Sequence, residues 1–170
     1  MSAADAAGAA LIETALAALR PRVGETFGPS RWITLDQPMI DAFAALTGDR
    51  QFIHVDPDAA RATPLGATVA HGFLTLALFS TLAEGLLPPV PGRVMGINYG
   101  FDRVRFVAPA PAGARIRATF RLTDAVPRPP AAVMLRLAAT VEIEGSARPA
   151  VSADWLTLSN LGPVTTPATR

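Results

Sequence analysis

The spacing of hydrophobic and polar positions predicts a well-defined helix in the first third of the chain. In "QPMIDAFAALTG", residues 37–48, the apolar residues fall near helical spacing. Asp36 stands at the expected N-cap, Pro38 fits only a first turn, and Gly48 supplies a C-terminal stop. We therefore expect a short helix with both ends fixed by the sequence.

Weaker patterns flank this helix. The Ala-rich start, residues 1–22, predicts an amphipathic arm or a leading helix. "SRWITLD", residues 30–36, alternates enough to be a strand. Residues 55–69 predict a short helical turn and a loop, because Pro57 and Pro64 limit regular structure there.

The most apolar stretch of the chain, residues 70–87, predicts a buried helix. It is apolar on nearly every side, which is typical of a helix wrapped by the rest of a domain. A helix of this length would measure about 27 Å. The following "LPPVPGR" should end it sharply.

Beyond this helix the pattern changes to that of long strands. Four segments read as antiparallel strands with alternating faces: "VMGINYGFDRVRFVAP", "ARIRATFRLTDAV", "AVMLRLAATVEIEG" and "RPAVSADWLTLS". A curved sheet that wraps the helix would bury both the apolar helix and the apolar face of a meander of such strands. We therefore expect an α+β chain with a single hotdog fold, a long central helix wrapped by a curved antiparallel sheet.

Composition narrows the classes of partner and compartment. The chain has 170 residues, half of them hydrophobic, and a formal net charge of +1 without blocks of like charge. Nucleic acid is therefore not expected as a partner, while the abundant apolar surface favours a dimer. The absence of cysteine excludes disulfides and thiolate chemistry. No segment reads as a signal peptide or as a membrane span, so we expect a soluble cytoplasmic protein.

One of the two histidines lies close to an acidic residue in "TGDRQFIHVD". Asp49 and His54 follow a helix end, where a loop can bring both side chains to one pocket. Together they can hold a water molecule, which the imidazole deprotonates while the carboxylate orients it. From the pattern alone a purely structural role for both residues stays open.

The second histidine opens the apolar stretch in "AHG", residues 70–72. The first N–H groups of a helix have no intrahelical acceptor, so they can stabilise an oxyanion. Gly72 would let a substrate carbonyl approach closely. The alternative is that Gly72 only relieves crowding between the helix and the sheet.

A metal site is not expected. Asp49, His54, Asp56 and Asp58 are clustered, but their spacing matches no known ligand pattern. Glycine-rich phosphate loops are also not found, because "GRVMGINYG" lacks the strand, loop and helix context.

Three segments together resemble a known family. "GDRQFIHVD", "GATVAHGFLTLALFS" and "INYGFDRVRFVAPAPAGARIRA" resemble the MaoC-like dehydratases, or (R)-specific enoyl-CoA hydratases, and in particular the branch related to nodulation protein N. The resemblance runs over residues 24–158. The family motif GD-x-N-P-x-H implies that Asp49 and His54 are the catalytic pair. This chain departs from it with Gln51 and Phe52 in place of Asn and Pro.

The resemblance also implies further site residues. The backbone N–H of Gly72 would donate to the thioester oxygen, and Ser80 stands at the position of a site serine found in some members. Gln51 can still donate and accept hydrogen bonds near the substrate. His71 would orient the helix start instead of reacting.

The implied reaction is reversible hydration of a trans-2-enoyl-CoA to an (R)-3-hydroxyacyl-CoA, with no metal or redox cofactor. Arg103 and Arg105, on one strand face by alternation, are candidates for the CoA phosphates, or else surface or dimer contacts. The family implies a homodimer. The domain division would be an arm or helix at 1–22, a MaoC-like hotdog domain at 23–160 and a flexible tail at 161–170.

Two other functions remain open. A hotdog thioesterase would need an acidic residue on the central helix, and Glu84, the only one there, lies close to the wrong end. A non-catalytic acyl-thioester binding protein would not need the pair formed by Asp49 and His54.

Overall fold

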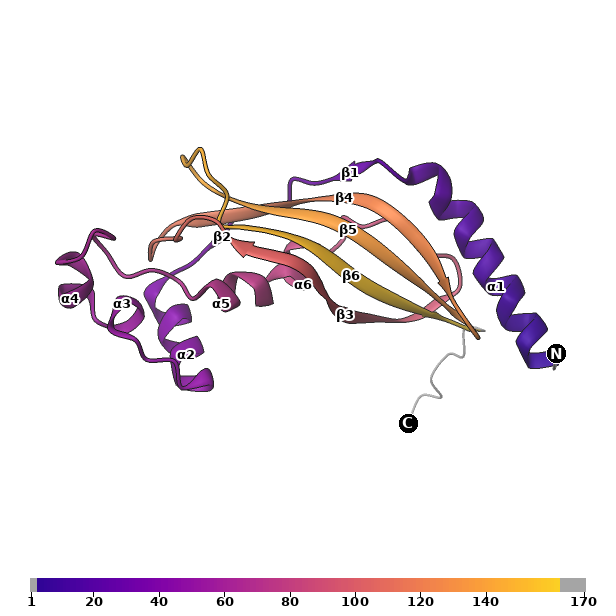
Figure 1. Ribbon diagram of the computed structural model, residues 1–170, viewed down its shortest axis with the longest axis horizontal. Helices are drawn as coiled ribbons and strands as arrows, with labels where there is room; N and C mark the ends of the chain where they lie inside the picture. Colours follow the sequence, from indigo (N-terminus) through magenta and orange to yellow (C-terminus); the bar gives the residue numbers. More distant parts are fainter. Residues whose placement is uncertain (1–2, 163–170) are drawn as a thin grey trace.

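Four long strands form the main layer of the computed structural model, which describes residues 3–162 (Figure 1). They are β3 (Arg93–Phe106), β4 (Arg115–Arg128), β5 (Ala132–Ile143) and β6 (Val151–Leu161), with two short strands, β1 (Thr26–Phe27) and β2 (Ile33–Thr34). All four long strands were predicted from alternation. The predicted strand over residues 30–36 is reduced to the two residues of β2.

The sheet is antiparallel and has the order β1-β4-β5-β6-β3, with β2 also paired to β4. The expected meander is therefore correct only for β4, β5 and β6, because β3 pairs with β6 and not with the strand that follows it. The segment between β3 and β4 is engaged elsewhere: the N–H of Ala70 donates to the carbonyl of Ala110 at 2.8 Å. The chain thus returns to the opposite side of the sheet before β4 begins.

The helix inside the curve of the sheet is shorter than predicted. It consists of α5 (Gly72–Ala77) and α6 (Phe79–Leu82), interrupted at Leu78. Gly85, with a positive φ of 72°, lies in the turns that follow. The apolar pattern runs on to residue 87 because Leu86 and Leu87 are also packed against the core without being helical.

The rest of the domain does not cover this helix on every side. Phe79 and Leu82 are fully buried, whereas Phe73 is 68% exposed. Phe79 makes edge-to-face contacts with the rings of Phe101, Phe120 and Trp155, which come from three different strands. This aromatic cluster fixes the helix against the sheet, giving the hotdog arrangement.

The N-terminal helix α1 (Ala3–Leu19) lies across one end of the sheet, followed by the 3₁₀ turn η1 (Arg20–Arg22) (Figure 1). Leu16 and Leu19 are fully buried in the same core as the strands. A Cβ at Gly8 would collide with the carbonyl oxygen of Pro130 in the β4–β5 turn. The predicted arm is thus a helix packed tightly on the sheet.

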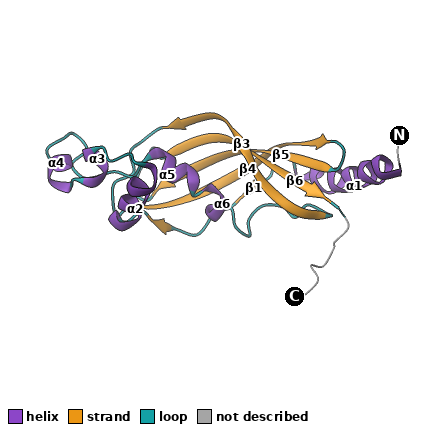
Figure 2. Cartoon of the chain, turned by 90° about the horizontal axis from the view of Figure 1, so that it is seen from below, coloured by secondary structure: helices purple, strands orange, loops and turns teal. Residues whose placement is uncertain are grey.

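Helices gather at the opposite end of the sheet (Figure 2). There α2 (Gln37–Thr47) has the predicted ends: Asp36 accepts a hydrogen bond from the N–H of Met39 at 2.9 Å, and Gly48 takes a φ of 80°. Two short helices follow, α3 (Phe52–Val55) and α4 (Pro57–Arg61). The expectation of a loop at His54 is wrong, because that residue lies in α3.

Within residues 3–162 no helix has both the length and the apolarity needed to span a membrane. Of the predicted flexible tail at 161–170, Leu161 ends β6, and residues 163–170 lie outside the described part of the chain.

Candidate functional site

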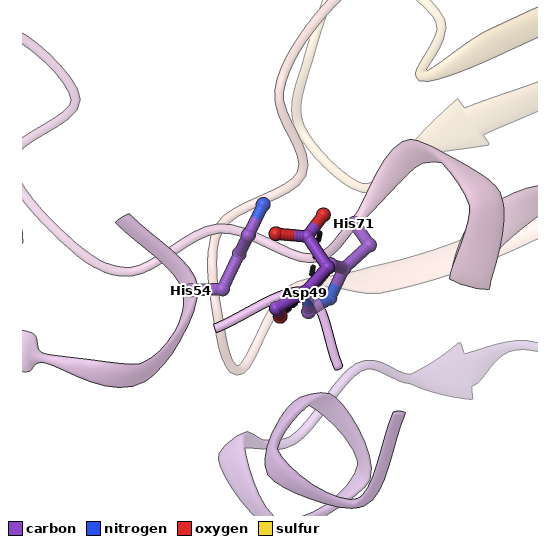
Figure 3. A group of neighbouring side chains, drawn as sticks. All are labelled: Asp49, His54 and His71. Carbon is purple, nitrogen blue, oxygen red and sulfur yellow. Dashed lines mark hydrogen bonds and ion pairs between the residues drawn. The ribbon is translucent and has the colours of Figure 1, made fainter. Parts of the chain in front are cut away.

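Asp49, His54 and His71 meet at the end of the sheet where the short helices gather (Figure 3). Asp49 follows the C-cap of α2, His54 lies in α3, and His71 immediately precedes α5. One polar atom from each side chain lies within 4.8 Å of the others. The structure thus brings together three residues that the sequence separates by up to 22 positions.

The imidazole of His54 is buried and has a defined tautomer. Its Nδ1 lies 2.6 Å from the carbonyl oxygen of Val69. Because a carbonyl oxygen only accepts, Nδ1 carries the proton of the neutral ring and Nε2 keeps its lone pair. The ring is thereby arranged as a proton acceptor at Nε2.

His71 is packed directly on this ring. The ring centroids of His54 and His71 are 3.7 Å apart with planes inclined by 24°, and the ring centroid of Phe43 lies 5.1 Å from that of His71. Nε2 of His71 donates to the backbone oxygen of Asp49 at 2.9 Å. The Asp49 carboxylate is farther from this nitrogen, at 4.0 Å, so the backbone oxygen is the main acceptor.

The carboxylate of Asp49 is open to solvent beside the buried imidazoles. Its side chain is 56% exposed, and its Oδ1 accepts a long hydrogen bond, 3.4 Å, from the N–H of Gln51. An exposed carboxylate next to a buried imidazole can hold a small polar molecule between them. Gln51 is itself exposed and directly precedes α3.

These three side chains do not fit a shared metal ion, although they include common ligand types. A metal binds an imidazole nitrogen close to the ring plane at about 2.0–2.1 Å. The stacked planes of His54 and His71 leave no position that lies in both planes at that distance. In addition, Nδ1 of His54 and Nε2 of His71 are already bonded to carbonyl oxygens.

Gly72 is the first residue of α5 and is crowded from one side. A Cβ there would lie 2.7 Å from the ring of Phe106. This contact supports the interpretation that Gly72 relieves crowding between the helix and the sheet. Independently, Gly72 is the first residue of α5, so its N–H has no acceptor within the helix. Gly72, Thr75 and Phe106 line a cavity of about 210 Å³.

Three other candidates lie on α6 and β3. Ser80 is on α6 and lines a different cavity, of about 470 Å³, with Glu84 and Arg93 among its walls. Arg103 donates from Nε to Asp154 at 2.6 Å, and Arg105 donates to the backbone oxygen of Val104.

Arg103 and Arg105 are both exposed, whereas Val104 between them is partly buried and packs against the core. The pairing of β3 with β6 shifts register between Asp102 and Arg105, which breaks the strict alternation of side chains along the strand. Strand periodicity alone does not reveal such a bulge.

Sequence reasoning missed the backbone support of His54. The carbonyl of Val69 has no side-chain signature, and its role follows only from the way residues 68–70 lie beside α3.

Comparison with known proteins shows the family of this chain. The model of the family described as "MaoC like domain" matches residues 18–136. The chain belongs to the MaoC-like dehydratase family. Nodulation protein N of Rhizobium meliloti (strain 1021) is 45% identical to this MaoC-like chain over 152 residues, which are 89% of this chain and 94% of that protein.

Another relative of this MaoC-like chain is named for a reaction. The 3-hydroxyacyl-thioester dehydratase Z of Mycobacterium tuberculosis is 45% identical over 139 residues, covering 82% of this chain and 91% of that protein. Among solved structures, the (R)-hydratase from A. caviae has a TM-score of 0.66 and 25% identity, covering 82% of this chain and 96% of that one. A protein from Archaeoglobus with 22% identity and a TM-score of 0.69 shares the fold.

Proposed function

We propose that this MaoC-like protein is an (R)-specific enoyl-CoA hydratase, which adds water reversibly to a trans-2-enoyl-CoA. The observation that carries the proposal is the buried His54, next to the open carboxylate of Asp49: its Nδ1–H donates to Val69, and its Nε2 has no hydrogen-bond partner among residues 3–162. A fixed base beside a carboxylate is the arrangement that activation of a water molecule requires.

In the proposed reaction the water lies between Asp49 and His54. Nε2 of His54 accepts a proton from the water as its oxygen bonds to C3 of the enoyl group, while the Asp49 carboxylate orients that water. The electron pair of the C2–C3 double bond moves toward the thioester oxygen, where the N–H of Gly72 stabilises the negative charge. The proton that His54 took from the water is then delivered to C2, which leaves His54 neutral again, so the net change is the addition of one water.

The chemistry needs no cofactor, and the stacking of His54 on His71 supports a site without a metal. Gln51, exposed beside Asp49, is proposed to contact the acyl thioester, and His71 to hold His54 in place. Ser80, which lines a different cavity, stays a prediction from the family resemblance. For the CoA phosphates, Arg105 is a better candidate than Arg103, because the guanidinium of Arg103 is paired with Asp154. The cytoplasmic location stays a prediction from the sequence.

We also propose a homodimer. The edge strand β3 exposes a row of large apolar side chains, Val94, Met95, Ile97 and Tyr99. An exposed apolar edge strand is a template for pairing with another chain. A second copy would cover this edge.

The test is the loss of enoyl-thioester absorbance on mixing the protein with crotonyl-CoA and with a longer trans-2-enoyl-CoA. We expect the wild type to remove the absorbance and to form an (R)-3-hydroxyacyl product, and Asp49→Asn and His54→Ala to be inactive. Asp58→Asn is the matched control, because Asp58 is 91% exposed and pairs only with Arg61 among the salt bridges of residues 3–162. Release of free thiol would instead identify a thioesterase, and no reaction with either substrate would favour a binding protein.

A further inference from the structure

We propose that Gln37 is a positioning residue of the site, which holds His54 so that its Nδ1–H stays directed at Val69. The inference rests on the proposed function in so far as His54 is the base. Gln37 is the first residue of α2 and lies outside the motif that contains Asp49 and His54. Its role was not expected from the sequence.

The carboxamide of Gln37 is fully engaged. Its Nε2 donates to the backbone oxygen of His54 and to Oδ1 of Asp41, each at 2.8 Å. Its Oε1 accepts a hydrogen bond from the hydroxyl of Thr68 at 2.5 Å. Because the two acceptors face Nε2 and the Thr68 hydroxyl donates to Oε1, the amide group of Gln37 has a single favourable orientation.

The backbone oxygen of His54 in α3 has Gln37 as its donor. A backbone oxygen inside a longer helix would accept from the residue four positions later, but α3 ends at Val55. The N–H of Asp58, which would be that donor to His54, instead donates to the side chain of Asp56 at 3.1 Å. The oxygen of His54 is therefore served by Gln37.

The Oε1 of Gln37 contacts the segment that supplies the acceptor for the His54 ring. Thr68 is 3% exposed and directly precedes Val69, whose carbonyl receives the Nδ1–H of His54. The N–H of Val69 in turn donates to the oxygen of Ile53 at 2.9 Å. Gln37 thus joins the two segments whose separation sets the length of the Nδ1–H···O hydrogen bond.

Two substitutions separate this role from simple packing. Gln37→Glu keeps the shape and the acceptor for Thr68, but it places a carboxylate in front of the His54 oxygen and Asp41. Asp41→Ala removes the other acceptor of Nε2 and leaves the contact with His54. Misplacing a reacting group by about 1 Å costs on the order of 100-fold in rate. We expect Gln37→Glu to lower kcat by about 10- to 100-fold with KM little changed, and Asp41→Ala to leave both constants close to wild type.

The tautomer of His54 gives a readout that does not need activity. Long-range ¹H–¹⁵N NMR spectra of the full-length protein distinguish a protonated from an unprotonated ring nitrogen. We expect Nδ1–H in the wild type and in Asp41→Ala, and a mixture of both tautomers in Gln37→Glu. If the full-length wild type hydrates no enoyl-CoA, the tautomer comparison still decides the positioning role.

Three results would overturn the proposal. One is a folded Gln37→Glu protein with wild-type kcat and the wild-type tautomer. Another is an Asp41→Ala protein with the same loss of kcat and the same mixture of tautomers as Gln37→Glu. Such a result would mean that a disturbance of α2, and not the hydrogen bond to His54, causes the effect. If Gln37→Glu does not fold, Thr68→Val removes only the hydroxyl that orients the amide, and a wild-type tautomer and kcat in that variant would equally refute the role.

Discussion

The rings of His54 and His71 are stacked with centroids 3.7 Å apart, and each ring is bound to a backbone carbonyl through a different nitrogen. Nδ1 of His54 faces Val69, whereas Nε2 of His71 faces Asp49. The nitrogen that donates to a carbonyl is therefore Nδ1 in one ring and Nε2 in the other, which in neutral imidazoles corresponds to opposite tautomers. Nδ1 of His71 is buried and has no hydrogen-bond partner among residues 3–162, so its lone pair is left unused.

This stacking predicts that His71 supports both neighbours. His71→Ala removes the ring under His54 and the donor to Asp49, and should destabilise the protein by about 2–4 kcal/mol through cavity formation and the lost hydrogen bond. His71→Gln can still donate to the Asp49 oxygen and should recover part of the loss. Urea unfolding measures the loss of stability, and kcat measures the effect on His54. Equal unfolding free energies for His71→Ala and His71→Gln would contradict a contribution from the hydrogen bond.

Gly72→Ala should be destabilising because the new methyl group meets the Phe106 ring at 2.7 Å. Overpacking of this kind costs about 1–3 kcal/mol. In a Phe106→Ala background the same change should cost much less, which a double-mutant cycle of unfolding free energies measures. Additive costs would show that Phe106 is not the obstacle.

Gly8→Ala should also destabilise, against the usual effect in helices. Alanine normally favours a helix over glycine by about 1 kcal/mol, but a Cβ at Gly8 collides with the carbonyl of Pro130. Thermal unfolding should therefore show a lower Tm. The control is Ala9→Gly on the exposed face of α1, which should lose only helix propensity. A raised Tm for Gly8→Ala would mean that α1 is not docked this closely.

The pair formed by Arg22 and Glu25 predicts a pH effect. Hydrogen bonds from the Arg22 guanidinium at 2.7 and 2.9 Å lower the pKa of Glu25 below its ordinary value. Its stabilising contribution is therefore present above the pKa of the unfolded chain and is lost as the pH falls through the folded pKa. Arg22→Gln should raise the pKa of Glu25 in an NMR titration, and an unchanged value would exclude the hydrogen bonds as the cause.

The apolar edge of β3 predicts association of the wild type. Ile97→Lys should convert the dimer to monomer, because it places a charge on the surface that the second copy would cover. Leu46→Lys is the control, since Leu46 is 85% exposed but lies on α2. Sedimentation velocity measures both, and a dimer that survives Ile97→Lys would place the interface elsewhere.

Local signals predicted the elements well and their connections less well. The ends of α2 follow from Asp36 and Gly48 alone, since capping is a property of neighbouring residues. The interruption of the central helix at Leu78 had no such signal, because apolar residues continue through the buried turns behind it. Periodicity also says nothing about which strand lies beside which, so the pairing of β3 with β6 was missed.

The candidate site shows the same limit. The sequence indicated Asp49 and His54 as the pair and His71 as an orienting residue, but the stacking of His71 on the His54 ring is visible only in the structure. Gln37 and the carbonyl of Val69 could not be found by spacing, because they reach His54 across distances of 17 and 15 positions through the fold.

The order of segments along the chain has a consequence for synthesis. Asp49 and His54 leave the ribosome before any long strand has been made, yet the segment that supports His54 is itself held by residues before β4: the N–H of Ala70 donates to the oxygen of Ala110, and the oxygen of Thr68 accepts from the N–H of Ala112. The strand β6, which joins β5 to β3, is completed only at Leu161. A nascent chain that stalls before β6 therefore carries Asp49 and His54 without the complete sheet, and it exposes the apolar residues of α1 and α6 to other unfinished chains.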